Sequence, residues 1–126
     1  MTASTTGPAP ARARVWHAVC RYADLEPERG VAALVGGQQL AVFRLHDGSV
    51  CAIDHRDPFS GAYVLARGIV GSRGDVPFVA SPMYKQAIDL RTGECLDDAG
   101  VRVRVFAVRI RDGRVEVATE PADGPG

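Results

Sequence analysis

Residues 51–57, with the sequence CAIDHRD, bring a thiol, an imidazole and two carboxylates close together along the chain. Such a set could supply a nucleophile with its base, or ligands for a metal ion. The first four residues alternate as in a strand, however, so Cys51 and Ile53 should share one face while Asp54 lies on the other. The thiol and the carboxylate are then separated, and we interpret His55 as a loop histidine that binds nearby backbone.

The remaining histidines, cysteines and glycine pairs form no ligand set in the sequence. His17 lies in a predicted strand and His46 lies beside a predicted turn, each without a partner at ligand spacing. The three cysteines are widely spaced and contain no CxxC pair, which argues against a disulfide framework and a zinc site; they are Cys20, Cys51 and Cys95. We expect three small buried thiols. Gly36-Gly37 lacks the Lys-Ser/Thr pair of a phosphate-binding loop.

Two loops that each contain a proline carry the strongest functional signal. The first, DPFSGA, begins at Asp57, and the second, SPMYKQ, begins at Ser81. If the loops are neighbours, their apolar and aromatic side chains meet; these are Pro58, Phe59, Tyr63, Pro82, Met83 and Tyr84. They either pack inward, with Phe59 as a plug, or form an exposed tip that docks on a partner protein. The sequence leaves both interpretations open.

Charged residues would surround this tip. We expect Arg56, Asp57, Arg67 and Lys85 at its rim. Lys85 is the one lysine of the chain, and it would either form an ion pair with Asp57 or a partner's carboxylate, or remain solvated.

Composition limits the classes of protein that the chain can belong to. Its 126 residues are 46% hydrophobic, enough for one domain core, and the formal net charge is zero. There is thus no global basic field for nucleic acid or anionic lipid, and no window approaches the ~20 apolar residues that span a bilayer. We expect a disordered leader over 1–13, one domain over 14–118 and a flexible tail over 119–126.

The two-residue periodicity of the apolar positions predicts strands rather than helices. Strands are expected over 15–20, 31–35, 40–45, 50–53 and 115–117, with a possible short helical turn after the first. GGQQ, Asp47-Gly48 and Asp112-Gly113 are predicted hairpin turns. Residues 54–76 form a long connection, in which RGIVGSRGDV is interpreted as a glycine-hinged excursion.

Near the end of the domain the apolar positions change phase. They run 101, 103, 105 and then 106, 108, 110, which predicts a β-bulge near Phe106. The fold class is therefore all-β, a small antiparallel sandwich or barrel, and we expect both proline loops at one tip.

The two loops and the hairpins before them, over roughly residues 15–117, resemble the Rieske-type iron–sulfur domains. Those domains bind a [2Fe–2S] cluster with Cys-x-His in one loop and Cys-x-x-His in the other. The resemblance places Asp57 and Phe59, then Ser81 and Tyr84, at the four ligand positions. Phenylalanine has no lone pair to donate, and the oxygens of the other three are hard donors, so we expect no cluster, metal or other cofactor in this chain.

The stretch FSGAYVLARGIVGSRGDVPFVASPMYKQAIDLRTGECLDD closely resembles a family without the cluster, the small subunits of assimilatory NAD(P)H-dependent nitrite reductase (NirD type). The resemblance implies a cytoplasmic chain that assists a large catalytic subunit carrying FAD, sirohaem and [4Fe–4S], which reduces nitrite to ammonium. It implies a structural or positioning role without catalytic residues in this chain. The candidates for docking on the large subunit are Pro58, Phe59, Tyr63, Arg67, Met83, Tyr84 and Lys85.

Two alternatives remain open from the sequence. One is a Rieske-type ferredoxin that transfers electrons to an oxygenase, which would require bound iron. The other is a free-standing binding or regulatory module with a small ligand in the former cluster site.

Overall fold

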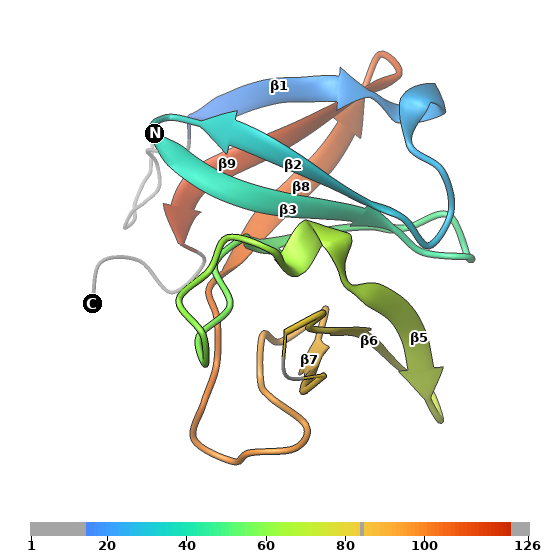
Figure 1. The fold of residues 1–126 in the computed structure, drawn as a ribbon. Coiled ribbons are helices and arrows are strands. Elements are labelled where there is room, and N and C mark those ends of the chain that lie inside the picture. Colours follow the sequence, from blue (N-terminus) through green and yellow to red (C-terminus); the bar gives the residue numbers. More distant parts are fainter. Residues whose placement is uncertain (1–14, 84, 122–126) are drawn as a thin grey trace, which may run out of the picture.

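The computed structural model describes residues 15–83 and 85–121, whose regular structure is strands apart from two short helices (Figure 1). The elements are β1 (Trp16–Arg21), η3 (Tyr22–Asp24), β2 (Gly30–Val35), β3 (Gln38–Arg44), β4 (Val50–Asp54), η4 (Leu65–Arg67), β5 (Ile69–Arg73), β6 (Val76–Ala80), β7 (Ala87–Asp89), β8 (Val105–Arg111) and β9 (Arg114–Pro121), where η denotes a short 3₁₀ helix. Within the described residues, no helix is long and apolar enough to cross a membrane.

The strands form two antiparallel sheets. Six strands make the larger sheet in the order β1-β9-β8-β4-β3-β2, and three make the smaller one in the order β5-β6-β7. The larger sheet curls so that its edge strands β1 and β2 approach each other, and the smaller sheet lies beside one end of this near-barrel (Figure 1). The predicted all-β fold is confirmed.

The predicted hairpins and the bulge are present. Asp112 and Gly113 both have positive φ, 53° and 75°, as the tight turn between β8 and β9 requires. The register of β8 against β9 shifts between Phe106 and Val108, which is the predicted bulge. In the first hairpin only Gly36-Gly37 forms the turn, because Val35 already pairs with Gln38.

Three boundaries differ from the prediction. Residues 69–80 form the hairpin β5–β6 rather than an excursion. This hairpin was not predicted because Gly71 interrupts the apolar pattern. In the structure Gly71 pairs with Phe78 of β6. A Cβ at Gly71 would lie 2.9 Å from the Phe78 ring, so the strand pairing requires a residue without a side chain there. Strand β9 reaches Pro121, so the first three residues of the expected tail belong to the sheet. Strand β8 begins at Val105, and 101–104 are outside it.

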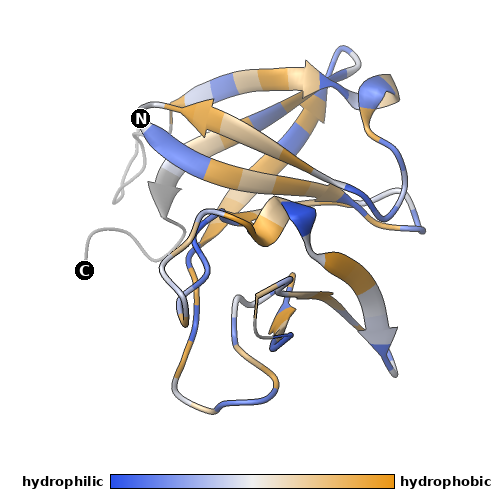
Figure 2. Cartoon of the chain, viewed as in Figure 1, coloured by the Kyte–Doolittle hydropathy of each residue, from blue (hydrophilic) through white to orange (hydrophobic). Residues whose placement is uncertain are grey.

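The core has two parts that share strand β3, which Figure 2 colours hydrophilic at its start and hydrophobic along its middle. Leu40 and Val42 pack inside the near-barrel, while Ala41 and Phe43 face the other way, toward the smaller sheet. This second part joins residues of both sheets, among them Ile53, Leu65, Val79, Ile88 and Leu90. The smaller sheet is thus held against the larger one by apolar contacts. The first proline loop follows β4 of the larger sheet, and the second joins β6 to β7 of the smaller one.

Candidate functional site

The two proline loops share one backbone pattern. In the first, the N–H of Gly61 donates to the Asp57 carbonyl at 2.8 Å, and the N–H of Asp57 donates to the Ala62 carbonyl at 2.8 Å. In the second, Lys85 and Ser81 repeat these bonds: Lys85 N–H donates to the Ser81 carbonyl at 2.8 Å and Ser81 N–H to the carbonyl five residues later at 3.0 Å.

Each loop closes through a residue in the left-handed region. That residue is Gly61 at φ 80° in the first loop and Lys85 at φ 66° in the second. A non-glycine residue rarely adopts this backbone, so Lys85 is held in an unfavourable conformation at the end of its loop.

A side-chain hydrogen bond joins the loops. The Ser81 hydroxyl donates to the carboxylate of Asp57, and both residues are buried, with 2% and 0% of their surface exposed. The other carboxylate oxygen of Asp57 accepts from the N–H of Phe59 at 2.8 Å, and the Ser81 oxygen accepts from the N–H of Met83 at 3.1 Å. Each side chain therefore caps its own loop and binds the other.

This arrangement does not fit a Rieske cluster. The resemblance assigns Asp57 and Ser81 to the two cysteine positions, and their oxygens are already bonded to each other and to loop N–H groups. Phe59 offers no donor atom, and the fourth position, Tyr84, lies outside the described residues. Among the residues that the structure describes, no three or more His, Cys, Asp or Glu side chains are grouped to hold a metal ion.

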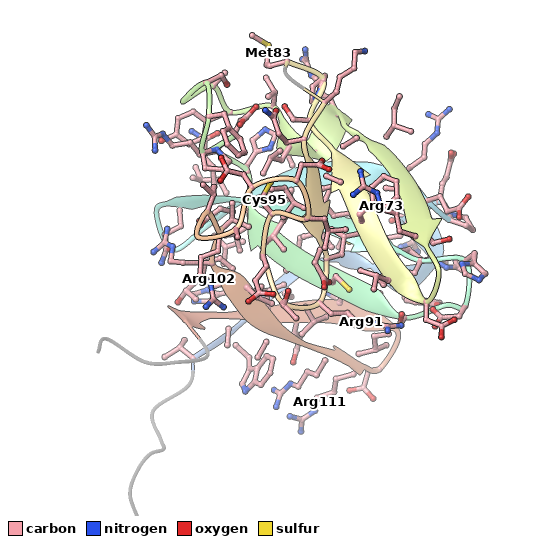
Figure 3. All side chains as sticks on the ribbon, turned by 90° about the horizontal axis from the view of Figure 1, so that it is seen from below. Arg73, Met83, Arg91, Cys95, Arg102 and Arg111 are labelled. Atoms are coloured by element: carbon pink, nitrogen blue, oxygen red, sulfur yellow. The ribbon has the colours of Figure 1, made fainter. Side chains whose placement is uncertain are left out.

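The predicted tip residues divide into buried and exposed ones. Phe59 is half-buried and packs against the core between the sheets, as expected of a plug. Tyr63 and Met83 are each 51% exposed, and Arg67 and Lys85 are exposed as well. Met83 projects at one end of the molecule in Figure 3.

One expectation for the rim was wrong, and one of the alternatives for Lys85 is not seen. Asp57 is fully buried and is not a rim residue. Its carboxylate binds Ser81 and loop N–H groups rather than Lys85, so the ion pair considered for Lys85 and Asp57 is absent from the described contacts.

His55 binds the backbone that follows the first loop through both its side chain and its carbonyl. Its side chain is buried, and its Nδ1 accepts a hydrogen bond from the Ala66 N–H at 3.1 Å, which confirms a histidine bound to backbone. Its carbonyl accepts from Val64 and Leu65 at 3.1 and 3.0 Å. Burial lowers the pKa of His55, and the Arg67 guanidinium lowers it further. The ring is therefore neutral at pH 7.

The thiol site considered for residues 51–57 does not form. Cys51 and Ile53 pack on the same part of the core, as predicted, while Asp54 on the other face binds Arg104. Burial raises the pKa of the Cys51 thiol, which disfavours a reactive thiolate. All three cysteines are free, but only Cys95 is fully buried, and Cys20 and Cys51 are half-buried.

The sequence missed one exposed apolar residue beside the second loop. Ile69 is 73% exposed and pairs with Ala80, the residue before Ser81. The alternation of residues 69–73 was the available signal, but Gly71 obscured it.

Comparison with known proteins gives a consistent result. A family model described as the Rieske-like [2Fe-2S] domain matches residues 15–118. The nitrite reductase (NADH) small subunit of Salmonella typhimurium is 40% identical over 103 residues, covering 81% of this chain and 95% of that protein. The crystal structure of an NADH-dependent nitrite reductase small subunit from Mycobacterium tuberculosis is 50% identical with a TM-score of 0.82, covering 85% of this chain and 96% of that one.

Two further matches show the domain in other settings. The nitrite reductase [NAD(P)H] large subunit of Klebsiella oxytoca is 39% identical over 107 residues, which are 85% of this chain but 11% of that longer protein. The ferredoxin of carbazole 1,9a-dioxygenase from Nocardioides aromaticivorans is 26% identical with a TM-score of 0.71, covering 82% of this chain and 96% of that one.

Proposed function

Because the chain belongs to the Rieske-like domain family and, within it, to the small subunits of NADH-dependent nitrite reductase, we propose that it is a positioning subunit without a redox centre of its own. The observation that carries the proposal is the hydrogen bond between Ser81 and Asp57. It links the two loops through the side chains that stand at the cysteine positions, so the loop pair is held without iron.

The partner is the large catalytic subunit, which carries FAD, sirohaem and [4Fe–4S] and reduces nitrite to ammonium with NAD(P)H in the cytoplasm. The Klebsiella oxytoca relative supports this pairing, because there the matching domain is one part of a large-subunit chain. A domain that is covalently attached in one protein is a good candidate for stable contact as a separate subunit in another.

The docking surface is formed by the two loops and by two residues that follow the first loop, Tyr63 and Arg67 of η4, and is here named the docking tip. It consists of Pro58, Phe59, Tyr63, Arg67, Met83 and Lys85, together with Tyr84 from the sequence prediction. Exposed Tyr63 and Met83 supply aromatic and flexible apolar contact area, and Arg67 and Lys85 add positive charge beside it. Interfaces are enriched in aromatic residues, methionine and arginine, which suits such a surface.

A matched pair of substitutions tests this proposal. Met83→Glu places a charge on the docking tip, and Ile110→Glu places one on β8, at a residue 48% exposed against 51% for Met83. Neither residue is buried, so both variants should keep the fold, which circular dichroism checks. Co-purification with the large subunit should be lost with Met83→Glu, with affinity reduced about tenfold or more, and retained with Ile110→Glu. Equal recovery of the large subunit with both variants would contradict docking through the tip.

Cross-linking gives a second readout. Lys85 is the only lysine of the chain, so an amine-reactive cross-linker can capture it and the N-terminal α-amine, which mass spectrometry of the cross-linked peptides tells apart. We expect cross-links from Lys85 to the large subunit in the assembled enzyme.

We do not propose the ferredoxin alternative, because the described loop residues lack the thiolate and imidazole donors that such a carrier needs. The free-standing module is distinguished by the same co-purification, since such a module would not elute with the large subunit.

A further inference from the structure

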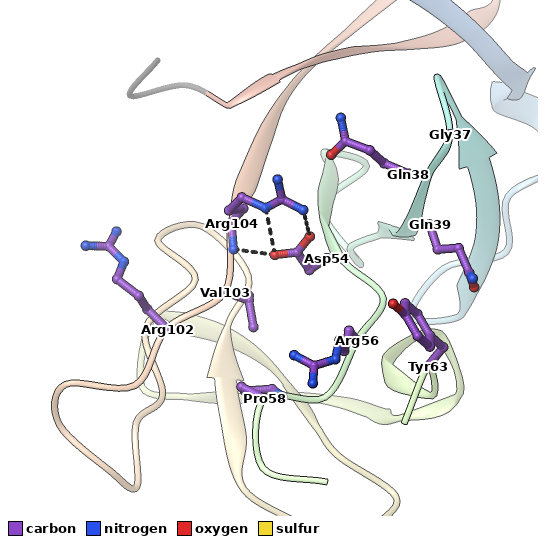
Figure 4. Close-up of a pocket in the computed structure, with 10 residues that line it drawn as sticks. All are labelled: Gly37, Gln38, Gln39, Asp54, Arg56, Pro58, Tyr63, Arg102, Val103 and Arg104. Carbon is purple, nitrogen blue, oxygen red and sulfur yellow. Dashed lines mark hydrogen bonds and ion pairs between the residues drawn. The ribbon is translucent and has the colours of Figure 1, made fainter. Parts of the chain in front are cut away.

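A cavity of about 440 Å³ opens beside the first loop (Figure 4). Its lining includes Pro58 of that loop, Tyr63 just after it, Gln38 at the start of β3, and Val103, which lies beside Pro58 in Figure 4. The cavity therefore shares two residues with the docking tip, so a protein bound to the tip can reach into it.

The lining of the cavity carries more positive than negative charge. It contains three arginines, and its only carboxylate is that of Asp54. Arg104 forms an ion pair with this carboxylate. Its guanidinium donates to the two Asp54 oxygens at 2.9 and 3.2 Å, and its backbone N–H donates to one of them at 2.8 Å. Hydrogen bonding to Asp54 raises the pKa of Arg104, so this pair is internally neutral.

The other two arginines have no such partner. Arg56 and Arg102 are exposed, and neither forms an ion pair with a carboxylate in the part of the chain that the structure describes. Arg102 only donates to the carbonyl of Thr92, at 3.2 Å. In Figure 4 the Arg56 guanidinium lies near Pro58 and Val103, on the side of the cavity, whereas the Arg102 side chain at the edge of the cavity extends away from the other labelled residues. The charge of Arg56 is thus available to an anion in the cavity, and Arg102 adds positive charge at the edge.

We infer that this cavity receives the carboxylate of an aspartate or glutamate side chain of the large subunit, which binds the Arg56 guanidinium and is attracted by the charge of Arg102 at the edge of the cavity. The inference rests on the proposed function and adds a second contact to it. The planar guanidinium group binds carboxylates through two parallel hydrogen bonds, and the Tyr63 hydroxyl can donate a further one. An acidic side chain also supplies the charge that this chain lacks at the cavity.

Charge reversal tests the inference. Arg56→Glu and Arg102→Glu are compared with Arg111→Glu, which makes the same change at the end of the molecule away from Met83 (Figure 3). Binding of each purified variant to the purified large subunit is measured between about 50 and 500 mM NaCl. We expect Kd at low salt to rise about tenfold for Arg56→Glu and by a smaller factor for Arg102→Glu, each with a weaker salt dependence, and to stay unchanged for Arg111→Glu.

A zero-length cross-link identifies the partner group. Arg56→Lys places an amine in the cavity, and a carbodiimide joins an amine directly to a carboxylate that it touches. Mass spectrometry should find residue 56 of this variant joined to an aspartate or glutamate of the large subunit, while Arg111→Lys should give no such product.

The outcomes separate the two proposals. If the unaltered chain binds the large subunit and the Arg56→Glu and Arg102→Glu variants bind equally well at every salt concentration, the carboxylate contact is wrong and the proposed function stands. If the unaltered chain does not bind the large subunit, both are wrong.

Discussion

Ser81 and Asp57 bind each other through their side chains across two loops that have the same backbone pattern. A buried carboxylate is costly unless its oxygens are hydrogen-bonded. Here one oxygen accepts from Ser81 and the other from the N–H groups of Phe59 and Ser60, at 2.8 and 3.5 Å. The same bonds that satisfy Asp57 therefore hold the two loops together.

Replacing Ser81 should weaken the fold. Ser81→Ala removes the donor to Asp57 and the acceptor of the Met83 N–H, and it leaves a buried carboxylate with fewer partners. We expect the free energy of unfolding to fall by about 1–3 kcal/mol, measured by urea denaturation.

An exposed serine–aspartate pair provides the control. The Ser49 hydroxyl donates to Asp47 at 2.7 Å in the turn between β3 and β4, where both residues are exposed. Ser49→Ala should change the stability by no more than about 0.5 kcal/mol. A similar loss for both variants would mean that burial does not distinguish the pair between the loops.

The donor set predicts how the chain responds to iron. After anaerobic incubation with iron and sulfide, the unaltered chain should remain colourless, because Asp57 and Ser81 are hard oxygen donors engaged with each other. Combining Asp57→Cys, Phe59→His, Ser81→Cys and Tyr84→His restores the Rieske donors, and this variant should gain visible charge-transfer absorption. Stoichiometric iron and acid-labile sulfide in the unaltered chain would overturn this account.

Much of the fold followed from the sequence, whereas the contact between the loops did not. Alternating apolar residues and the turn at Asp112-Gly113 specify strands locally, so those elements could be predicted. The hairpin β5–β6 was missed because Gly71 has no side chain, and its role becomes visible only opposite Phe78.

The pairing of Asp57 with Ser81 joins residues 24 positions apart, and no local pattern indicates it. The sequence identified both residues only as former ligand positions, which explains why Asp57 was expected at an exposed rim.

His55 should make the stability depend on pH. Its neutral Nδ1 accepts from the Ala66 N–H, and burial, with a smaller effect of Arg67, lowers the pKa of His55 in the folded chain. The unfolded chain then takes up a proton more readily than the folded one. Stability is therefore full above the ordinary histidine pKa of about 6.5 and is lost as the pH falls toward the lowered folded value.

A variant without a titrating ring isolates this effect. In His55→Asn the amide oxygen can accept from Ala66 at every pH, so stability should vary less between about pH 7.5 and 5.5 than in the unaltered chain. Denaturation midpoints at several pH values measure the difference. Parallel pH profiles for the two proteins would assign the acid sensitivity to other groups.

Gly93 should be essential for the turn that anchors the segment carrying Arg102. It has φ +82°, and a Cβ there would lie 2.2 Å from the carbonyl oxygen of Val103, whose N–H donates to the Gly93 carbonyl at 2.8 Å. Gly74, with φ +60° and nothing within 4 Å of a Cβ, shares the backbone conformation without the clash. Gly74→Ala should cost about 1–2 kcal/mol for the left-handed backbone alone. Gly93→Ala should cost about 1–3 kcal/mol more in urea denaturation, because the segment with Val103 must move. Equal losses of unfolding free energy for the two variants would mean that the segment with Val103 moves at little cost. The turn would then not fix the position of Arg102 at the cavity.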